Sequence, residues 1–283
     1  MMTMTRIKII VDSVADIPLS MRQKWDIGLI PTYVNYGGNS YADDGIELDR
    51  TAFYNAMPDM GEFPTTSAPS PALAEDILRQ SLDGYDHIVA IHVPERYSST
   101  INVTRLAAQE IAPDRITVID GHSLTAGLGL LGLMAAEKAA ETDDVQQIVS
   151  LVERVRDQIT IYAAIATMTY MQRSGRVNNV VAAVGSILQI KPLLRVQQGD
   201  IDVLHRIRTF GRAVDKVREL AHEHTPLERL MVLHIQNEDG ANQLKSDLEP
   251  LLPQDIPIME VGPTLGSFIG PGSLGVLVLP QVK

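Results

Sequence analysis

The chain has 283 residues, of which 45% are hydrophobic, a length and composition typical of about two globular domains with substantial cores. Its formal net charge is −11 at pH 7, and its Lys and Arg residues form no basic run, which argues against a nucleic-acid partner. The absence of cysteine excludes a disulfide framework and a thiolate metal site, and it suits a reducing compartment.

Strands alternate with helices in the first half of the sequence, beginning directly after an N-terminus without the apolar core of a leader segment. The location is therefore expected to be cytoplasmic. Asp16 is a candidate helix cap, and Ser70 followed by Pro71 is typical of a helix start. In chain order we expect a strand over 7–13, a helix over 16–25, a strand over 28–36, a loop over 37–49, a helix from Pro71, a strand over 87–93, a helix over 101–111 and a strand over 115–120. Strand, crossover helix and strand in repetition predict a doubly wound, mainly parallel sheet.

Residues 124–136 carry no charge and end at Glu137 and Lys138. Thirteen apolar residues are fewer than the roughly 20 that a helix needs to cross a bilayer. This segment is therefore expected to be a buried helix, and no stable membrane insertion is expected.

The second half is patterned differently. Residues 191–209 predict a β-hairpin with its turn near Gly199 and Asp200, which is typical of an antiparallel or mixed sheet. Helices are expected over 144–158, 212–224 and 241–252, with strands over 160–166, 229–235, 256–261 and 274–279. The whole chain is expected to be an α/β protein of two domains, an N-terminal domain over 1–157 and a C-terminal domain over 158–283.

Gly127, Gly129 and Gly132 have the order G-x-G-x-x-G of a dinucleotide-binding loop. Six residues separate Asp120, the end of the preceding strand, from Gly127, whereas the first glycine of a nucleotide loop directly follows its strand. The glycines are therefore expected inside the helix. Gly129 and Gly132 share a face, and they serve either tight packing of the helix or a groove for an apolar ligand.

Hydroxyl-bearing residues gather in two loops, PTTSAPSP over 64–71 and RYSST over 96–100. Loops at the carboxyl ends of parallel strands converge on the binding crevice of an open α/β sheet, and helix N-termini flanked by Ser and Thr hydroxyls attract anions. These clusters predict an anion-binding crevice. The alternative is that each cluster only caps its own helix.

Other chemistry finds little support in the sequence. The phosphate-loop motif and the G-x-S-x-G nucleophile motif are both absent. Asp12 beside Ser13, with His122 elsewhere, does not make a hydrolase triad by adjacency in sequence. His222 and His224 are two residues apart and point to different faces of a helix, so they are not expected to hold a metal ion together. No metal site and no cofactor are expected in this chain.

Six segments in order resemble the landmarks of the DegV family of bacterial fatty-acid-binding proteins and span nearly the whole chain. They are VDSVADIP, PTTSAPSP, VIDGHSLTAGLG, MTYMQRSGRV, KPLL with its glycine hairpin and IRT, and GPGSLGV. The resemblance implies a two-domain α/β protein that buries a fatty acid and holds its carboxylate at the domain interface. It also implies a fatty acid kinase partner, which forms an acyl phosphate for phospholipid synthesis, and no catalysis by this chain on its own.

The resemblance carries over to particular residues. Thr66 matches a threonine that binds the carboxylate, with Ser67 beside it, and Ser98 matches the serine of a Ser-Gly-Thr signature. Arg208 and Arg176 match basic residues at the head-group end. Arg208 is expected to reach the carboxylate, and Arg176 to face the kinase or its phosphates, although either arginine could also be a solvated turn charge.

Three positions depart from the family pattern. Ser99 replaces a usual glycine, Ala68 a frequent glutamine, and Phe268 a histidine that many members have near the carboxylate. The loss of that histidine shifts the head-group role towards Arg208 and the hydroxyls. One alternative function stays open, an enzyme that acts on a small phosphorylated or carboxylated metabolite in the same crevice.

Overall fold

The computed structural model describes residues 5–185, 190–252 and 254–281, and these residues form two compact units. The first unit contains the residues up to Leu48 together with Thr66–Asp157. The second contains Asp49–Thr65 and the residues from Gln158 onward. The chain therefore passes between the units at 48/49 and 65/66 as well as at 157/158, and the expected domain over 1–157 needs this correction.

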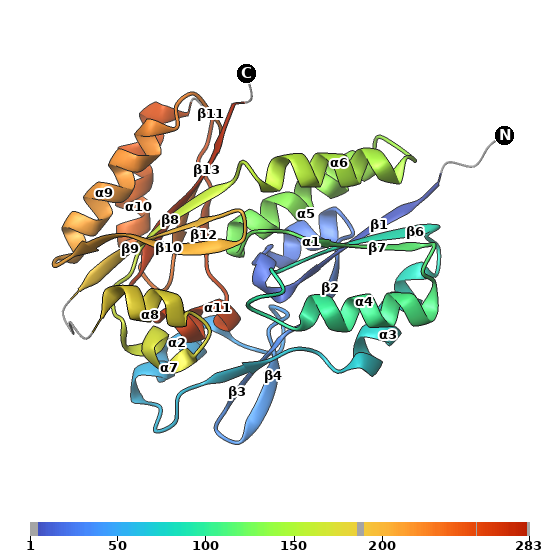
Figure 1. Cartoon of the computed structure of the whole chain (residues 1–283), viewed down its shortest axis with the longest axis horizontal. Coiled ribbons are helices and arrows are strands. Elements are labelled where there is room, and N and C mark those ends of the chain that lie inside the picture. Colours follow the sequence, from blue (N-terminus) through green and yellow to red (C-terminus); the bar gives the residue numbers. More distant parts are fainter. Residues whose placement is uncertain (1–4, 186–189, 253, 282–283) are drawn as a thin grey trace. The chain divides into compact units, whose positions relative to one another are not determined.

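A parallel sheet of four strands is the centre of the first unit, in the order β2-β1-β6-β7 (Figure 1). Its neighbouring strands are all parallel, with Ile10 opposite Gly28 of β2 and Ala90 of β6. The strands are β1 (Ile7–Asp12), β2 (Gly28–Ile30), β6 (His87–His92) and β7 (Ile116–Asp120). This sheet confirms the fold class expected from the alternation of strands and helices.

Helices cover both faces of this sheet, because successive residues of β1 point to opposite sides. Ile10 packs in one core with Leu78 of α3 and Ala107 of α4. Val11 points the other way and lies against α5. The four helices are α3 (Pro71–Leu82), α4 (Thr100–Ile111), α5 (Thr125–Ala139) and α6 (Val145–Arg156).

The segment between β1 and α3 differs from the expectation. The expected strand over 28–36 is two strands interrupted at Pro31, because proline lacks the N–H that would continue the ladder of β2. The expected loop contains β4 (Asn39–Ala42), which pairs with β3 (Tyr33–Tyr36). A three-stranded sheet is formed by β3, β4 and β5 (Thr65–Ser67).

Asp16 does not cap a helix. It follows the short 3-10 helix η1 (Ser13–Ala15) with a left-handed φ of 52°, and α1 (Leu19–Lys24) begins after Pro18 without a side-chain cap. Ser70 behaves as expected, because its hydroxyl accepts a hydrogen bond from Leu73 N at the start of α3.

The second unit contains a mixed sheet of six strands in the order β10-β9-β8-β13-β11-β12. The predicted hairpin is confirmed, with Gln198 and Gly199 in its turn at positive φ. All neighbours are antiparallel except β11 and β12. The strands are β8 (Thr160–Ala164), β9 (Lys191–Gln197), β10 (Asp200–Ile207), β11 (Leu227–His234), β12 (Ile258–Glu260) and β13 (Leu274–Pro280).

Helices α9 and α10 contribute to one core with this sheet, in which Val217 and Leu244 pack with Val276. The helical elements of this unit are α2 (Arg50–Ala56), η2 (Met57–Asp59), α7 (Thr169–Ser174), α8 (Asn178–Val184), α9 (Phe210–Glu223), α10 (Glu238–Leu248), η3 (Glu249–Leu251) and α11 (Pro263–Ile269). Among the helices of the described residues, none has the length and apolar character that a membrane span requires.

Polar contacts explain why the segment Asp49–Thr65 belongs to the second unit. The Tyr54 hydroxyl is buried and donates to the carbonyl oxygen of Val261 at 2.6 Å. Arg50 Nη1 donates to the carbonyl oxygen of Glu260 at 3.1 Å. A Cβ on Gly266 of α11 would lie 2.0 Å from the Tyr54 hydroxyl oxygen, so the glycine is required by this close approach.

Candidate functional site

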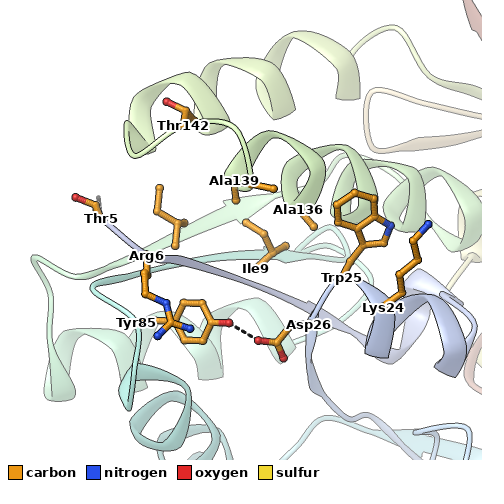
Figure 2. A pocket seen from close by; sticks show the side chains of 12 residues that line it. Thr5, Arg6, Ile9, Lys24, Trp25, Asp26, Tyr85, Ala136, Ala139 and Thr142 are labelled. Carbon is orange, nitrogen blue, oxygen red and sulfur yellow. Dashed lines mark hydrogen bonds between the residues drawn. The ribbon is translucent and has the colours of Figure 1, made fainter. Parts of the chain in front are cut away.

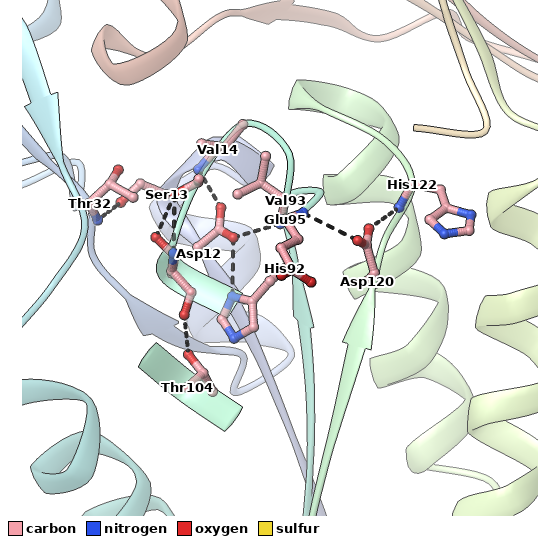
Figure 3. Close-up of polar contacts among 12 residues, drawn as sticks. Asp12, Ser13, Val14, Thr32, His92, Val93, Glu95, Thr104, Asp120 and His122 are labelled. Carbon is pink, nitrogen blue, oxygen red and sulfur yellow. Dashed lines mark hydrogen bonds and ion pairs between the residues drawn. The ribbon is translucent and has the colours of Figure 1, made fainter. Parts of the chain in front are cut away.

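Asp12 ends β1 and connects three segments at the carboxyl edge of the parallel sheet (Figure 3). Its Oδ1 accepts a hydrogen bond from Val14 N at 2.9 Å, so that it caps η1. Its Oδ2 accepts from Val93 N at 2.8 Å and lies 3.1 Å from Nδ1 of His92. Asp12 therefore fixes where the chain leaves both β1 and β6.

The Asp12 and His92 side chains have no solvent exposure. Figure 3 shows the imidazole on the side of the carboxylate that faces the end of β6. Nε2 of His92 is buried and has no hydrogen-bond partner within the described residues. A buried nitrogen without a partner costs about 1–3 kcal/mol, which makes this pair a place where the structure tolerates an energetic penalty.

Ser98 and Thr100 lie in the loop that follows β6 and at the start of α4. Their hydroxyl oxygens are 2.9 Å apart, and Ser98 Oγ also accepts a hydrogen bond from Thr100 N at 3.2 Å. Thr104 Oγ1 donates to the carbonyl oxygen of Thr100 at 3.0 Å. Thr100 and Thr104 are fully buried, whereas Ser98 is half-buried, so Ser98 is the member of this hydroxyl group that a ligand can reach.

Ser99 does not need the glycine usual at its position. Its φ is −78°, an ordinary backbone conformation for any residue, and its side chain makes no capping hydrogen bond to α4. The departure at Ser99 therefore introduces no backbone strain next to Ser98.

The neighbouring polar residues do not assemble a hydrolase. Ser13 Oγ accepts a hydrogen bond from Thr32 N at 2.9 Å, and no hydrogen bond joins Ser13 to a histidine within the part of the chain that the structure describes. His122 Nδ1 lies 3.0 Å from Asp157 Oδ1, at a half-exposed position. The nucleophile, base and orienting carboxylate of a triad are therefore not in contact.

Asp120 ends β7 and anchors the two adjoining loops. Its Oδ1 accepts from His122 N at 2.9 Å, and its Oδ2 accepts from Glu95 N at 3.3 Å. His122 has a φ of 48° and Thr125 a φ of 44°, which is strained for a β-branched residue. The Thr125 hydroxyl donates to Oδ2 of Asp16 at 2.7 Å, so a buried hydrogen bond holds this conformation at the start of α5.

Thr66 and Ser67 lie on β5 of the small three-stranded sheet. Thr66 is half-buried and Ser67 is exposed. Asn35 Nδ2 of β3 is 3.4 Å from Ser67 Oγ. Ser67 is thus connected to the neighbouring strand, and neither hydroxyl caps a helix, a role that belongs to Ser70.

The faces of Gly129 and Gly132 on α5 are filled by other parts of the first unit. A Cβ on Gly129 would lie 2.4 Å from the carbonyl oxygen of Ala15, and a Cβ on Gly132 would lie 2.7 Å from Val11 Cγ1. Of the two interpretations made from the sequence, tight packing of the helix accounts for both glycines. A backbone carbonyl and a valine occupy the space beside these glycines in which an acyl-chain groove was expected.

Two aromatic rings in the second unit lie beside the arginines of its MTYMQRSGRV segment. The guanidinium of Arg176 is 5.8 Å from the ring centre of Phe268 on α11. The guanidinium of Arg173 is 4.1 Å from the ring centre of Phe63, which in turn packs on Tyr170 at 5.4 Å. Phe268, where many members have histidine, therefore supports Arg176 through a cation–π contact.

Arg208 directly follows β10 and is separated from the first residue of α9, Phe210, by Thr209. It is exposed, and within the described residues it has neither a carboxylate partner nor a hydrogen bond. An exposed guanidinium without a partner in a chain of net charge −11 is available to an anionic ligand or partner.

The described residues contain no group of three or more His, Asp and Glu side chains arranged to hold a metal ion. Sequence reasoning missed Asp12 with His92 and Asp16 with Thr125, because these partners are 80 and 109 residues apart. The available signal was a polar residue at the end of each parallel strand. Asp12, His92 and Asp120 all stand at such strand ends.

Comparison with known proteins identifies the DegV family over nearly the whole length of the chain. The family profile described as "Uncharacterised protein, DegV family" matches residues 6–281. A DegV domain-containing protein of Deinococcus radiodurans is 31% identical over 97% of this chain and 98% of its own length.

Solved structures agree with this result. A fatty-acid-binding DegV family protein from Thermus thermophilus superposes with a TM-score of 0.87 at 28% identity, covering 98% of this chain and 100% of the other. DegV from Bacillus subtilis, described as a fatty acid binding protein, gives 0.87 at 27% identity with the same coverage. The profile match and the relatives extend over nearly the whole chain, and the chain belongs to the DegV family.

Proposed function

We propose that this protein binds a long-chain fatty acid without transforming it, with the acyl chain buried and the carboxylate held by hydroxyl groups. Full-length similarity to two structures described as fatty acid binding supports the ligand class. The observation from this chain that carries the proposal is the hydrogen-bonded pair of Ser98 and Thr100.

Hydrogen-bond capacity explains why that pair suits a carboxylate. A hydroxyl has one hydrogen to donate and two lone pairs to accept with. When Thr100 donates both its backbone N–H and its hydroxyl to Ser98 Oγ, the two lone pairs of Ser98 are used. The remaining Ser98 hydrogen then requires an acceptor, and an ionised carboxylate accepts hydrogen bonds only.

Thr66 and Ser67 supply further hydroxyls from the first unit, and Arg208 of the second unit supplies a positive charge. Thr66 is half-buried on a strand and does not cap a helix, which leaves its hydroxyl for a ligand. Arg208 lacks a carboxylate partner within the described residues. We assign the head group to Thr66, Ser67, Ser98 and Arg208, and we assign no acyl-chain role to Gly129 or Gly132.

A fatty acid kinase is the proposed partner, and it would form the acyl phosphate on the bound ligand for phospholipid synthesis. Arg176 supports a contact with that kinase or its phosphates, because its guanidinium rests on the Phe268 ring, which keeps it oriented at little entropic cost. The absence of contact among Ser13, His92 and His122 supports a carrier over a hydrolase.

Mass spectrometry of an organic extract from the purified, denatured protein tests the proposal. A stoichiometric fatty acid, retained without turnover of soluble esters or phosphates, is the expected result. An empty extract after incubation with a panel of fatty acids would contradict it. Turnover of a small phosphorylated or carboxylated metabolite without a partner would instead favour an enzyme.

A further inference from the structure

A cavity of the first unit lies at the other end of β1 from Asp12. It has a volume of about 340 Å³ and lies where β1 begins, beside the end of α1 and the last turn of α5 (Figure 2). Its lining residues are Thr5, Arg6, Ile7, Ile9, Lys24, Trp25, Asp26, Tyr85, Ala136, Ala139, Ala140 and Thr142. Because β1 separates this cavity from the hydroxyl group at the carboxyl edge, the two are distinct places on the unit.

Apolar side chains form the floor of this cavity. Ile9 and Ala136 are buried and face one another from β1 and α5 in Figure 2. The indole of Trp25 and the ring of Tyr85 stand on either side of that floor. A floor of aliphatic groups between two aromatic walls favours an apolar or aromatic body, and a volume near the lower end of ligand sites restricts it to a small molecule.

Two cations lie at the cavity, and each is placed by an aromatic ring. The guanidinium of Arg6 lies 4.7 Å from the ring centre of Tyr85, and Nζ of Lys24 lies 5.3 Å from the ring centre of Trp25. Within the described residues neither cation has a carboxylate at ion-pairing distance. Stacking on a ring orients a cation while leaving its hydrogen-bond donors free for an anion.

The one acidic residue of the lining is already engaged. Asp26 Oδ1 lies 2.5 Å from Lys8 Nζ, and the Tyr85 hydroxyl donates to its Oδ2. Burial by itself would raise the pKa of Asp26, but these hydrogen bonds and the charges of Lys8 and Arg6 hold it below its usual value. Asp26 therefore stays ionised and balances Lys8 directly, with a further attraction to Arg6, so its one negative charge does not offset the three positive charges of Lys8, Arg6 and Lys24.

We propose that this cavity binds a small amphipathic anion, an apolar or aromatic body that carries one carboxylate or phosphate group. The body lies on Ile9 and Ala136 between the two rings, and the anionic group is bound by Arg6 beside Tyr85 or by Lys24 beside Trp25. The cavity is thus a second ligand site, independent of the hydroxyl site assigned to the fatty acid head group.

Trp25 is the only tryptophan of the chain, so tryptophan emission reports on this cavity alone. The probes are 3-phenylpropionate and phenyl phosphate, with the uncharged 3-phenylpropionamide as the matched control, each titrated into the full-length protein. A saturable change of emission with at least one anion, and none with the amide at the same concentrations, is the expected result. Comparing the two anions distinguishes a carboxylate from a phosphate ligand.

Three cavity variants and one control locate the site. Arg6→Gln or Lys24→Gln, whichever removes the cation that holds the anionic group, is expected to weaken anion binding about tenfold, because a charged hydrogen-bond donor is lost. Arg79→Gln, which removes an exposed guanidinium on α3 outside the cavity, is the control and leaves binding unchanged. Ala139→Leu fills the cavity while leaving both charges in place, and it is expected to abolish binding.

A second titration with oleate-saturated protein separates the two sites. Unchanged anion affinity supports an independent site, and complete loss overturns it, because the probe would then have entered the acyl site. The proposal is also overturned if neither anion produces a saturable change, if the amide binds equally well, if neither Arg6→Gln nor Lys24→Gln weakens binding, or if Arg79→Gln weakens it as much as either of them does.

Discussion

Asp12 and His92 form a hydrogen-bonded pair with no solvent exposure, and through it the ends of β1 and β6 are joined. Because the same carboxylate also accepts from Val14 N and Val93 N, removing it would leave three buried donors without an acceptor.

The first prediction concerns the stability contributed by this pair. Asp12→Ala is expected to lower the free energy of unfolding by about 3–5 kcal/mol, as breaking a buried polar pair generally does. Asp157→Ala, which breaks the half-exposed contact with His122, is the control and is expected to cost about 0–1 kcal/mol. Urea unfolding measures the free energy of unfolding of both variants. If the two variants lose equal stability, the prediction that the buried contacts of Asp12 contribute more than the half-exposed contact of Asp157 is wrong.

The second prediction concerns the hydroxyl site. Ser98→Ala is expected to weaken fatty acid binding about tenfold, because the carboxylate loses a half-buried hydrogen-bond donor. Ser99→Ala is the matched control, since Ser99 is adjacent and exposed and makes no capping bond. Competition with a fluorescent fatty acid measures both affinities, and the assignment of the head group fails if the two variants bind alike.

The third prediction separates ligand binding from transfer to the kinase. Arg176→Gln is expected to reduce acyl phosphate formation with a fatty acid kinase about tenfold while the amount of bound fatty acid stays constant. Arg229→Gln, on β11, is the control. Loss of bound lipid in Arg176→Gln would place this arginine at the carboxylate instead of at the kinase.

The fourth prediction concerns the glycines of α5. Gly129→Ala is expected to destabilise the protein by about 1–3 kcal/mol, because the added Cβ would meet the carbonyl oxygen of Ala15. Gly211→Ala in α9 is the matched control, since a Cβ there meets nothing within 4 Å and alanine favours the helix. A stable Gly129→Ala protein would reopen this face of α5 to a ligand.

The fifth prediction concerns pH. Burial lowers the pKa of His87, His224 and His234 below the ordinary value of 6.5. Just below pH 6.5 these histidines take up protons in the unfolded chain but not in the folded protein. Their contribution to the free energy of unfolding is therefore fully present above about pH 6.5 and falls as the pH drops below it. Urea unfolding at about pH 7.5 and about pH 5.5 measures the loss.

One variant assigns part of that pH dependence. Nε2 of His224 lies 2.7 Å from the hydroxyl oxygen of Tyr162, in a half-buried contact. His224→Gln keeps a polar partner for Tyr162 but does not titrate, so it is expected to lose less stability between the two pH values than the unchanged protein. If His224→Gln loses as much stability between the two pH values as the unchanged protein, His224 does not contribute to the pH dependence.

Periodicity predicted the parallel sheet of the first unit because its signals are local. Alternating buried strands and helices, the Ser70 cap and the 198–199 hairpin turn all depend on residues close in sequence. The break at Pro31 was equally local, since proline cannot continue the ladder, and it was overlooked. The hydroxyl clusters directed attention to two loops, but only the folded structure distinguishes half-buried Ser98 from the helix cap Ser70.

Contacts between distant residues could not be read from spacing. The composition of Asp49–Thr65 does not predict that Tyr54 donates a hydrogen bond to Val261. The glycines of α5 are compatible with a groove or with a close approach of the backbone, and only the position of Ala15 in the folded chain distinguishes the two. Asp12 beside Ser13 was not expected to form a hydrolase triad with His122, but its actual partner, His92, could not be read from the sequence.

The excursion of the chain through Asp49–Thr65 has a consequence for biosynthesis. Tyr54 leaves the ribosome 207 residues before Val261, a delay of roughly 10–40 s at ordinary rates of synthesis. During that interval the first unit can complete its parallel sheet, while Phe53 and Tyr54, both buried in the finished protein, stay without the rest of their unit. The second unit can therefore close only when its last strands have been made.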